Sequence, residues 1–358
     1  MSEDRQLSEL SKFNKNKWPL GNDGSLKQNK LIKRYTAHKR RSEEFVTYLK
    51  NHFYEVGHEA SLKEINLRKQ IPRVDECGSY LLFRQYYLMQ DDTRLVSANF
   101  CKKHTLCGLC AVRRAAKGAQ NLHEKAKQVL SDQPNLKAHY IVLTVKNEPD
   151  LEYGMRKLKK AWKRVRDIRN YATQAKKRVN PSQSKYASAL GSQFANVVGG
   201  AYSIEVTYNE EEKTWHPHIN LLVLSETEIN NNELSSEWHG YTGDSFITHC
   251  KQIDLIEDRW AFCEIMKYAM KFSELGFKQH KEAYLTLLNQ RLKGSIGAFR
   301  GTDLNPDPAD ETLEGEPYIE TLLSYLNGNY NEFSERRSGV EQGNKEPVWV
   351  RSDLLPNK

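Results

Sequence analysis

The sequence predicts an α+β fold, and three stretches carry that prediction. Residues 139–145 and 214–224 are rich in aliphatic and β-branched side chains, as buried strands are. Residues 150–178 instead repeat apolar side chains every three or four positions, as an amphipathic helix does. Strands and long helices therefore share the chain, which is typical of a sheet covered by helices.

Composition indicates a globular chain with a basic excess. The 358 residues are 28% charged, with a mean hydropathy of -0.75, and suffice for one large domain or two ordinary ones. Lys and Arg outnumber Asp and Glu by 54 to 46, which suits a polyanionic partner without proving one. No apolar run is as long as a membrane span, and residues 1–20 lack the apolar core of a signal peptide. We therefore expect a cytoplasmic protein without membrane contact.

The first 66 residues are expected to form a basic, partly disordered arm and a helix. Residues 1–41 are polar and show little periodicity, as mobile segments do. Residues 40–53 then show helical spacing of their apolar side chains.

A cysteine-bearing region follows at 67–125. Residues 79–89 and 94–100 predict a β-hairpin, which would bring Cys77 and Cys101 together at its open end. Shortly afterwards comes a Cys-x-x-Cys pair formed by the thiols of Cys107 and Cys110. Four thiolates suit a tetrahedral structural Zn²⁺ site.

Two alternatives to this four-cysteine site stay open. His104 is a spare ligand should Cys77 not reach the metal, and the Cys-x-x-Cys pair could instead be a redox pair. A disulfide framework is not expected, because the chain is long and has no secretion signal.

A region at 126–280 carries the residues that suggest catalysis. A helix at 111–130 leads into the strand at 139–145. The helix at 150–178 then presents a dense basic face in which Asp167 is the lone acid between 153 and 178. Because solvated helices normally mix both signs of charge, this face favours phosphate binding.

The next segment predicts a β-hairpin with a metal site. Strand 201–208 and strand 214–224 flank an acidic turn, and His216 and His218 share one face of the second strand. Cross-strand pairing brings Glu205 within reach of both imidazoles, a ligand set that suits Mg²⁺ or Mn²⁺. The histidines could also be the polar edge of a strand, and Glu205 a solvated carboxylate.

Residues 252–275 predict a helix with phosphate-handling groups. Glu264 and Tyr268 are four positions apart, and so are Lys267 and Lys271, so each pair lies on one flank of the helix. The tyrosine could instead be a core residue, and the glutamate a surface carboxylate paired with a lysine.

The last region, 281–358, is expected to be a helical extension with a loose tail. Residues 279–292 predict a helix, and a Gly-, Pro- and Asp-rich segment follows. We expect a short helix near 317–327 and a polar tail from 328. No activity is assigned to this region.

Three blocks resemble the motifs of a known superfamily. HYIVLTVKN, HPHINLLVL and EIMKYAMK, in this order, resemble the three motifs of the HUH endonucleases, and most of all those of the plasmid rolling-circle replication initiators (Rep proteins). CGSYLLFR and FCKKHTLCGLCAVRRA are similar to the cysteine region of that family. The resemblance covers about residues 70–275. Two departures are Asn220, where relatives often have a further histidine, and Gly108, where they usually have proline.

The resemblance implies a ferredoxin-like or RRM-like antiparallel sheet with the histidine strand at its centre. It implies that Tyr268 is the nucleophile, that it forms a 5′-phosphotyrosine and leaves a 3′-hydroxyl primer, and that Glu264 activates water at termination. Lys267 or Lys271 would neutralise phosphate charge. Plasmid origin DNA, a host helicase and the replication machinery are the implied partners.

Two other functions remain open. A relaxase or transposase of the same superfamily would use the same chemistry. A non-catalytic zinc-containing nucleic-acid-binding protein would explain the charge and the cysteines, but not the histidines and the Glu-x-x-x-Tyr helix.

Overall fold

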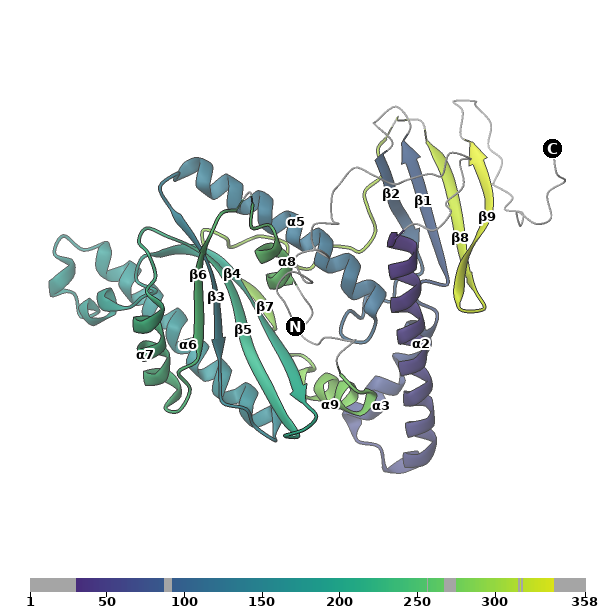
Figure 1. Cartoon of the computed structure of the whole chain (residues 1–358), viewed down its shortest axis with the longest axis horizontal. Coiled ribbons are helices and arrows are strands. Elements are labelled where there is room, and N and C mark those ends of the chain that lie inside the picture. The colour runs from purple at the N-terminus through teal and green to yellow at the C-terminus, as the bar shows by residue number, and fades with distance from the viewer. Residues whose placement is uncertain are drawn as a thin grey trace. The chain divides into compact units, whose positions relative to one another are not determined.

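The computed structural model describes residues 30–86, 92–255, 257–266, 275–314, 316 and 318–337. They divide into two units, unit 1 from Met1–Arg114 and Asp307–Lys358, and unit 2 from Ala115–Pro306 (Figure 1). Among the described helices, none is both long enough and apolar enough to span a bilayer.

Three helices begin unit 1: α2 (Lys30–Val56), α3 (Leu62–Arg68) and α4 (Ile71–Asp75), with the short 3₁₀ turn η1 (Gly57–Glu59) between the first two. The helix expected at 40–53 is confirmed, but it begins at Lys30, inside the segment expected to be a mobile arm. Tyr35 explains the difference, because its ring is only 1% exposed and therefore holds this turn against the core.

Within the described residues, unit 1 holds a four-stranded antiparallel sheet in the order β2-β1-β8-β9. The strands are β1 (Tyr80–Tyr86), β2 (Asp92–Ala98), β8 (Ile319–Leu326) and β9 (Asn329–Arg337). The hairpin of β1 and β2 is the one predicted from the sequence.

The prediction of a short helix near 317–327 is wrong, because residues 319–326 form strand β8. The prediction of a loose tail from 328 is also wrong in its first part, because residues 329–337 form strand β9. Asn327 and Gly328 have φ angles of 51° and 78° and form the two-residue turn between β8 and β9. Asn-Gly is the favoured sequence for such a turn, since both positions need positive φ. Leu323 is buried between more exposed neighbours, as an alternating strand requires.

The described part of unit 2 holds a five-stranded antiparallel sheet in the order β6-β3-β5-β4-β7. Its strands are β3 (Lys137–Thr144), β4 (Val197–Asn209), β5 (Thr214–Ser225), β6 (Thr248–Ile253) and β7 (Lys293–Gly297). The histidine strand β5 is the central strand, with β3 and β4 on either side (Figure 1).

Helices pack on both faces of this sheet. They are α5 (Gly108–Asp132), α6 (Leu151–Lys176), α7 (Asn231–Thr242), α8 (Trp260–Met266) and α9 (Phe277–Leu287), with the 3₁₀ turns η2 (Pro181–Gln183) and η3 (Ala187–Gly191). Helix α6 lies against the face that carries Pro217. Gly154 of α6 approaches this face so closely that a Cβ there would be 3.1 Å from the Pro217 ring.

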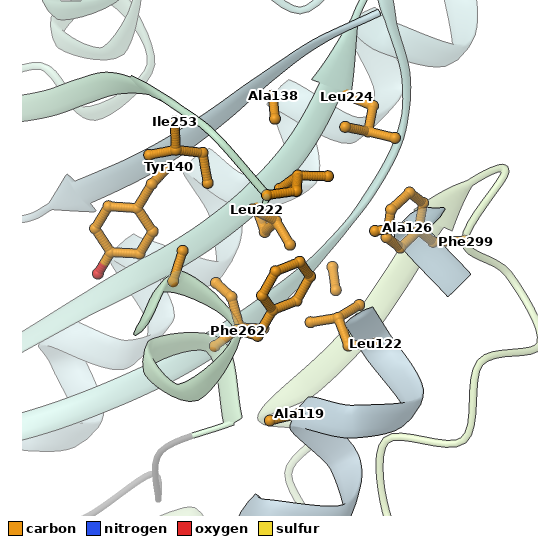
Figure 2. Close-up of a cluster of buried hydrophobic side chains, with 14 of the residues drawn as sticks. Ala119, Leu122, Ala126, Ala138, Tyr140, Leu222, Leu224, Ile253, Phe262 and Phe299 are labelled. Carbon is orange, nitrogen blue, oxygen red and sulfur yellow. The ribbon is translucent and has the colours of Figure 1, made fainter. Parts of the chain in front are cut away.

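The opposite face carries the hydrophobic core shown in Figure 2, where Leu222 and Leu224 of β5 meet Leu122 and Ala126 of α5 and Phe262 of α8. Because side chains two apart on a strand share a face, His216 and His218 lie on this side of the sheet as well. Tyr140 lies at the margin of the cluster, with its hydroxyl directed away from it (Figure 2).

The helix expected at 252–275 begins later than the sequence suggested. Residues up to Ile253 belong to β6, and α8 begins at Trp260. Asp254 and Asp258 separate the two elements, since the Asp258 carboxylate accepts a hydrogen bond from the Asp254 amide at 3.0 Å. Such local hydrogen bonds compete with helix formation. The sequence also failed to indicate α7, β6 and β7.

Candidate functional site

The hairpin of β4 and β5 places the three expected metal ligands on neighbouring strands. In its register Glu205 lies opposite His218 and Thr207 lies opposite His216. The His218 Nε2 atom is 3.3 Å from Oε2 of Glu205, and the imidazole rings are 5.4 Å apart. The structure therefore brings His216, His218 and Glu205 together, with Glu205 only 3% exposed.

The surroundings of the His216 imidazole favour its neutral form. Burial and the neighbouring His218 lower the pKa of His216, and Glu205 opposes the shift only in part. His216 is therefore neutral at pH 7, the form that binds metals. Its Nδ1 atom is 2.6 Å from Oδ1 of Asn147, so Nδ1 carries the proton and Nε2 keeps its lone pair.

Asn220 is the next polar side chain after His216 and His218 on the same face of β5, and it stands where relatives often have a further histidine. Its Oδ1 atom accepts a hydrogen bond from the Tyr140 hydroxyl at 2.8 Å, and its Nδ2 donates to Oε2 of Glu205 at 3.2 Å. Both Asn220 and Glu205 are buried. Asn220 is thus held by both ends of its amide and fixes the Glu205 carboxylate beside His218.

Helix α8 places Glu264 on the same side of the sheet. The helix buries Phe262, Ile265 and Met266 in the core of Figure 2. Burial raises the pKa of Tyr140, and the negative charges of Glu264 and Glu205 raise it further. Both carboxylates thus act electrostatically on the Tyr140 hydroxyl.

The remaining catalytic candidates, Tyr268, Lys267 and Lys271, lie outside the described residues. At the end of α8, the carbonyl of Met266 accepts a hydrogen bond from Lys293 Nζ at 2.7 Å. Lys293 begins β7, so it places a cation beside the end of this helix. Sequence reasoning missed Lys293, because its position depends on β7, which had no strand signal.

The four cysteines of unit 1 converge as predicted. Cys77, Cys101, Cys107 and Cys110 are all buried, and their sulfur atoms lie within 4.8 Å of one another. Neighbouring Sγ atoms are 3.4 to 3.6 Å apart. A disulfide would need about 2.05 Å. Four sulfurs around Zn²⁺ at about 2.3 Å would be separated by about 3.8 Å, so the thiols fit a tetrahedral zinc ion.

Hydrogen-bond donors surround the sulfurs. The amides of Cys101 and Lys103 each lie 3.4 Å from a sulfur, and hydrogen bonds from the other three thiols lower the pKa of Cys107. His104 is not needed as a ligand, because Cys77 is in the cluster and Nδ1 of His104 is 2.8 Å from the Arg114 guanidinium.

Gly108 is explained by its contact with α2. A Cβ at this position would be 2.9 Å from the His38 ring, so a larger residue would displace the helix. Its amide donates to the Ser42 hydroxyl at 3.3 Å. Glycine at this position therefore leaves room for the His38 ring and provides a backbone amide donor, which proline would lack.

The basic face of α6 is smaller than the sequence suggested. Arg169 is buried and donates to the carbonyls of Val197 and Val198. Several lysines are held by partners: Lys157 by Asp244, Lys163 by Asp167 and Lys176 by Glu226. Of the described basic side chains at 156–178, those that are exposed and form no hydrogen bond or ion pair are Arg156, Lys160 and Arg164 of α6, and Lys177 and Arg178 just after it.

Comparison with curated proteins finds relatives of one name. A protein of Streptococcus pneumoniae named "Protein rep" is 28% identical over 195 residues, which are 52% of this chain and 48% of the relative. A "Protein rep" of Lactiplantibacillus plantarum is 27% identical over 177 residues, covering 48% of each chain. A "Protein rep" of Staphylococcus aureus is 24% identical over 260 residues, which are 70% of this chain and 97% of the relative.

The matched part thus spans about half the length of the first two relatives. No family model matches the chain, and no solved structure is significantly similar to it.

Proposed function

We propose that this chain is a plasmid rolling-circle replication initiator that nicks and rejoins one strand of origin DNA. The observation that carries the proposal is the shared sheet face on which His216, His218 and Glu205 come together beside helix α8. The relatives named "Protein rep" support the same function.

The group of His216, His218 and Glu205 fits a divalent cation. Two imidazoles and a carboxylate on rigid neighbouring strands would hold Mg²⁺ or Mn²⁺. Among the described residues, the four cysteines are the only group of three or more His, Cys, Asp or Glu side chains whose ligand atoms all lie within 4.8 Å of one another. Of the proposed cation ligands, His218 and Glu205 are already 3.3 Å apart. Bound there, the ion supplies Lewis-acid polarisation of a non-bridging oxygen of the scissile phosphate.

The proposed nucleophile is Tyr268, four residues after Glu264. Its phenolic oxygen attacks phosphorus, the bond to the 3′ oxygen breaks, and a 5′-phosphotyrosine remains. The freed 3′-hydroxyl primes synthesis, and the phosphotyrosine conserves the bond energy for rejoining. Glu264 acts as the general base for water at the terminating cleavage. Lys267 or Lys271 neutralises charge on the phosphate.

The four cysteines are proposed to hold a structural Zn²⁺, because a closed thiolate shell leaves no open coordination position for catalysis. The proposed partners are the plasmid origin, single-stranded at the nick, and the host helicase and replication machinery in the cytoplasm.

A second candidate is a non-catalytic nucleic-acid-binding protein with a zinc site. The unpaired cations of α6 favour it as much as they favour the initiator. An HUH transposase or relaxase would share the nicking chemistry and differ in its DNA substrate.

The test is nicking of a labelled single-stranded origin library with added Mg²⁺ or Mn²⁺. Wild type should give a cleaved strand and a protein–DNA adduct that survives denaturant, and Tyr268→Phe should give neither. Tyr284→Phe is the matched control, since Tyr284 is the next tyrosine along the chain and is buried in α9. Binding without cleavage by wild type would favour the non-catalytic candidate, and an adduct with Tyr268→Phe would exclude that nucleophile.

A further inference from the structure

Unit 2 contains a hollow that the proposed nicking site does not use. It has a volume of about 780 Å³ and is bordered by α6, by η3 and the residues on both sides of it, and by α7. This volume is within the range of about 300–1,000 Å³ that is usual for ligand sites. Since α6 lies on the Pro217 face of the sheet, the hollow is on the opposite side from His216 and His218.

The walls of the hollow are fixed by packing and hydrogen bonds. Ala172 of α6 packs with Ala189 and Ala195 in a small apolar cluster behind the wall. The Glu237 carboxylate accepts hydrogen bonds from the Ser192 hydroxyl at 2.5 Å and the Gln193 amide at 2.9 Å, and a further one from the Tyr241 hydroxyl. Glu233, the other carboxylate of the lining, accepts a hydrogen bond from the Gln193 side-chain amide at 2.5 Å, so both acidic groups already have donors from the wall.

A tyrosine pair forms the aromatic part of the lining. The rings of Tyr171 and Tyr186 are stacked, with centroids 4.6 Å apart and planes inclined by 3°. The Lys185 ammonium lies 4.9 Å from the centroid of Tyr186. Tyr171 keeps 37% of its surface exposed, although a tyrosine ring is largely apolar. Because Tyr186 covers one face of the Tyr171 ring, the opposite face is the one on which a further planar ring could stack.

Two cations of the lining are available to a ligand. Arg164 is exposed and, among the described residues, forms neither a hydrogen bond nor an ion pair. Among the described residues, Lys185 forms no hydrogen bond or ion pair, and its ammonium lies over the Tyr186 ring. Arg178 lies at the edge of an adjoining hollow that shares Lys185 and Tyr186. An aromatic face beside unpaired cations is the combination that binds single-stranded nucleic acid.

We propose that this hollow binds one unstacked base of single-stranded DNA together with its phosphate. The base stacks on the exposed face of Tyr171, and the phosphate takes Arg164 and Lys185 as counter-ions. The choice of DNA rests on the proposed function, and the site would hold the origin strand away from the nick. The stack supplies affinity without reading the base, because every base has an aromatic face.

The test measures fluorescence anisotropy of labelled oligo-dT with the full chain and no added divalent metal. Tyr171→Ala and Arg164→Gln should each weaken binding about fivefold or more, and Tyr171→Phe should keep wild-type affinity because it keeps the ring. Tyr153→Ala is the matched control for Tyr171→Ala. Tyr153 is an exposed tyrosine on the same helix, outside the hollow, with the Arg156 guanidinium 6.0 Å from its ring centroid.

A strand of the same length with abasic sites separates base stacking from phosphate binding. Wild type should prefer oligo-dT to this strand, and Tyr171→Ala should lose most of that preference. Equal losses in Tyr171→Ala and Tyr153→Ala, or no base preference in wild type, would overturn the inference.

Nicking of a short oligonucleotide that spans only the scissile site separates this inference from the proposed function. A wild-type chain that never nicks but shows the Tyr171 effect would refute the initiator and keep the binding site. A chain that nicks, but binds oligo-dT equally well without the Tyr171 ring, would support the initiator and refute this binding site.

Discussion

Asn220 and Glu205 share a hydrogen bond inside the sheet, where the side-chain amide of Asn220 donates to Oε2 at 3.2 Å. The same oxygen lies 3.3 Å from Nε2 of His218. The Tyr140 hydroxyl in turn donates to the Asn220 carbonyl oxygen. A buried row of four side chains therefore ends at the proposed metal site, and each member orients the next.

Replacing Asn220 with leucine should weaken the metal site. The substitution removes the donor that positions Glu205 and the acceptor of the Tyr140 hydroxyl. We expect a loss of Mn²⁺ affinity of about 10- to 100-fold and a loss of unfolding free energy of about 1–3 kcal/mol. Electron paramagnetic resonance titration of Mn²⁺ measures the first quantity. Ser203→Ala, buried directly opposite in the register, is the control. Unchanged Mn²⁺ affinity in Asn220→Leu would show that Asn220 does not position the carboxylate.

Replacing Cys110 with serine should abolish zinc binding. Wild type is expected to contain about one Zn²⁺ per chain, and the variant close to none, with a cooperative thermal transition at a lower temperature. Elemental analysis and calorimetry measure the two effects. Cys263→Ser is the control, because Cys263 lies outside the four-cysteine cluster. Wild type that contains no zinc, or that unfolds at an unchanged temperature after a chelator has removed its zinc, would contradict the assignment of a structural zinc site.

The pair formed by Arg113 and Asp310 should be a large contributor to the stability of unit 1. The Arg113 guanidinium is 9% exposed, lies 2.6 Å from Asp310, and also donates to the Pro308 carbonyl and the Tyr35 hydroxyl. Asp310→Asn leaves this buried cation without its counter-charge, and we expect a cost of about 3–5 kcal/mol in urea unfolding. Lys102→Gln breaks the exposed pair with Asp307 and should cost less than about 1 kcal/mol. Similar losses of unfolding free energy in Asp310→Asn and Lys102→Gln would show that the buried pair contributes no more than the exposed one.

The unfolding free energy should fall as the pH drops below about 6.5, the usual pKa of histidine. Burial lowers the pKa of His139, which is only 2% exposed. Between the unfolded and folded pKa values the unfolded chain binds a proton that folded His139 does not, so acid favours unfolding. Urea unfolding at pH 7.5 and 5.5 should show a loss of unfolding free energy for wild type, and His139→Gln should lose less of it over the same pH interval. An identical pH dependence in both proteins would exclude this role.

The sequence was most informative where a local pattern decided the structure. The apolar tail of β5 and the polar turn before it determine the histidine hairpin, and its register follows from the turn. The spacing of Cys107 and Cys110, together with the β1–β2 hairpin, predicts the four-thiol cluster. In these places the contacts are close in sequence.

Other features depend on contacts that no local pattern carries. Strand β6 is largely exposed at the sheet edge, so it lacks the apolar run of a buried strand. The bridge from Tyr140 through Asn220 to Glu205 crosses three strands and appears only once they are aligned. Strand β8 is different, because its Asn327-Gly328 turn was a usable signal that was outweighed by a run of helix-compatible residues.

The sheet of unit 1 combines strands from the N-terminal and C-terminal parts of the chain, so its strands cannot all pair at the same stage of translation. All four cysteines precede residue 115, so the nascent chain can bind zinc while unit 2 is still being translated. Strand β1, however, pairs on one side with β2 and on the other with β8, which leaves the ribosome some two hundred residues later. Until then one edge of β1 has unpaired amides, the kind of edge that recruits foreign strands. Unit 2, continuous from 115 to 306, can fold in the meantime. Strands β8 and β9 therefore complete the sheet of unit 1, which β1 and β2 began, only after unit 2 has been synthesised.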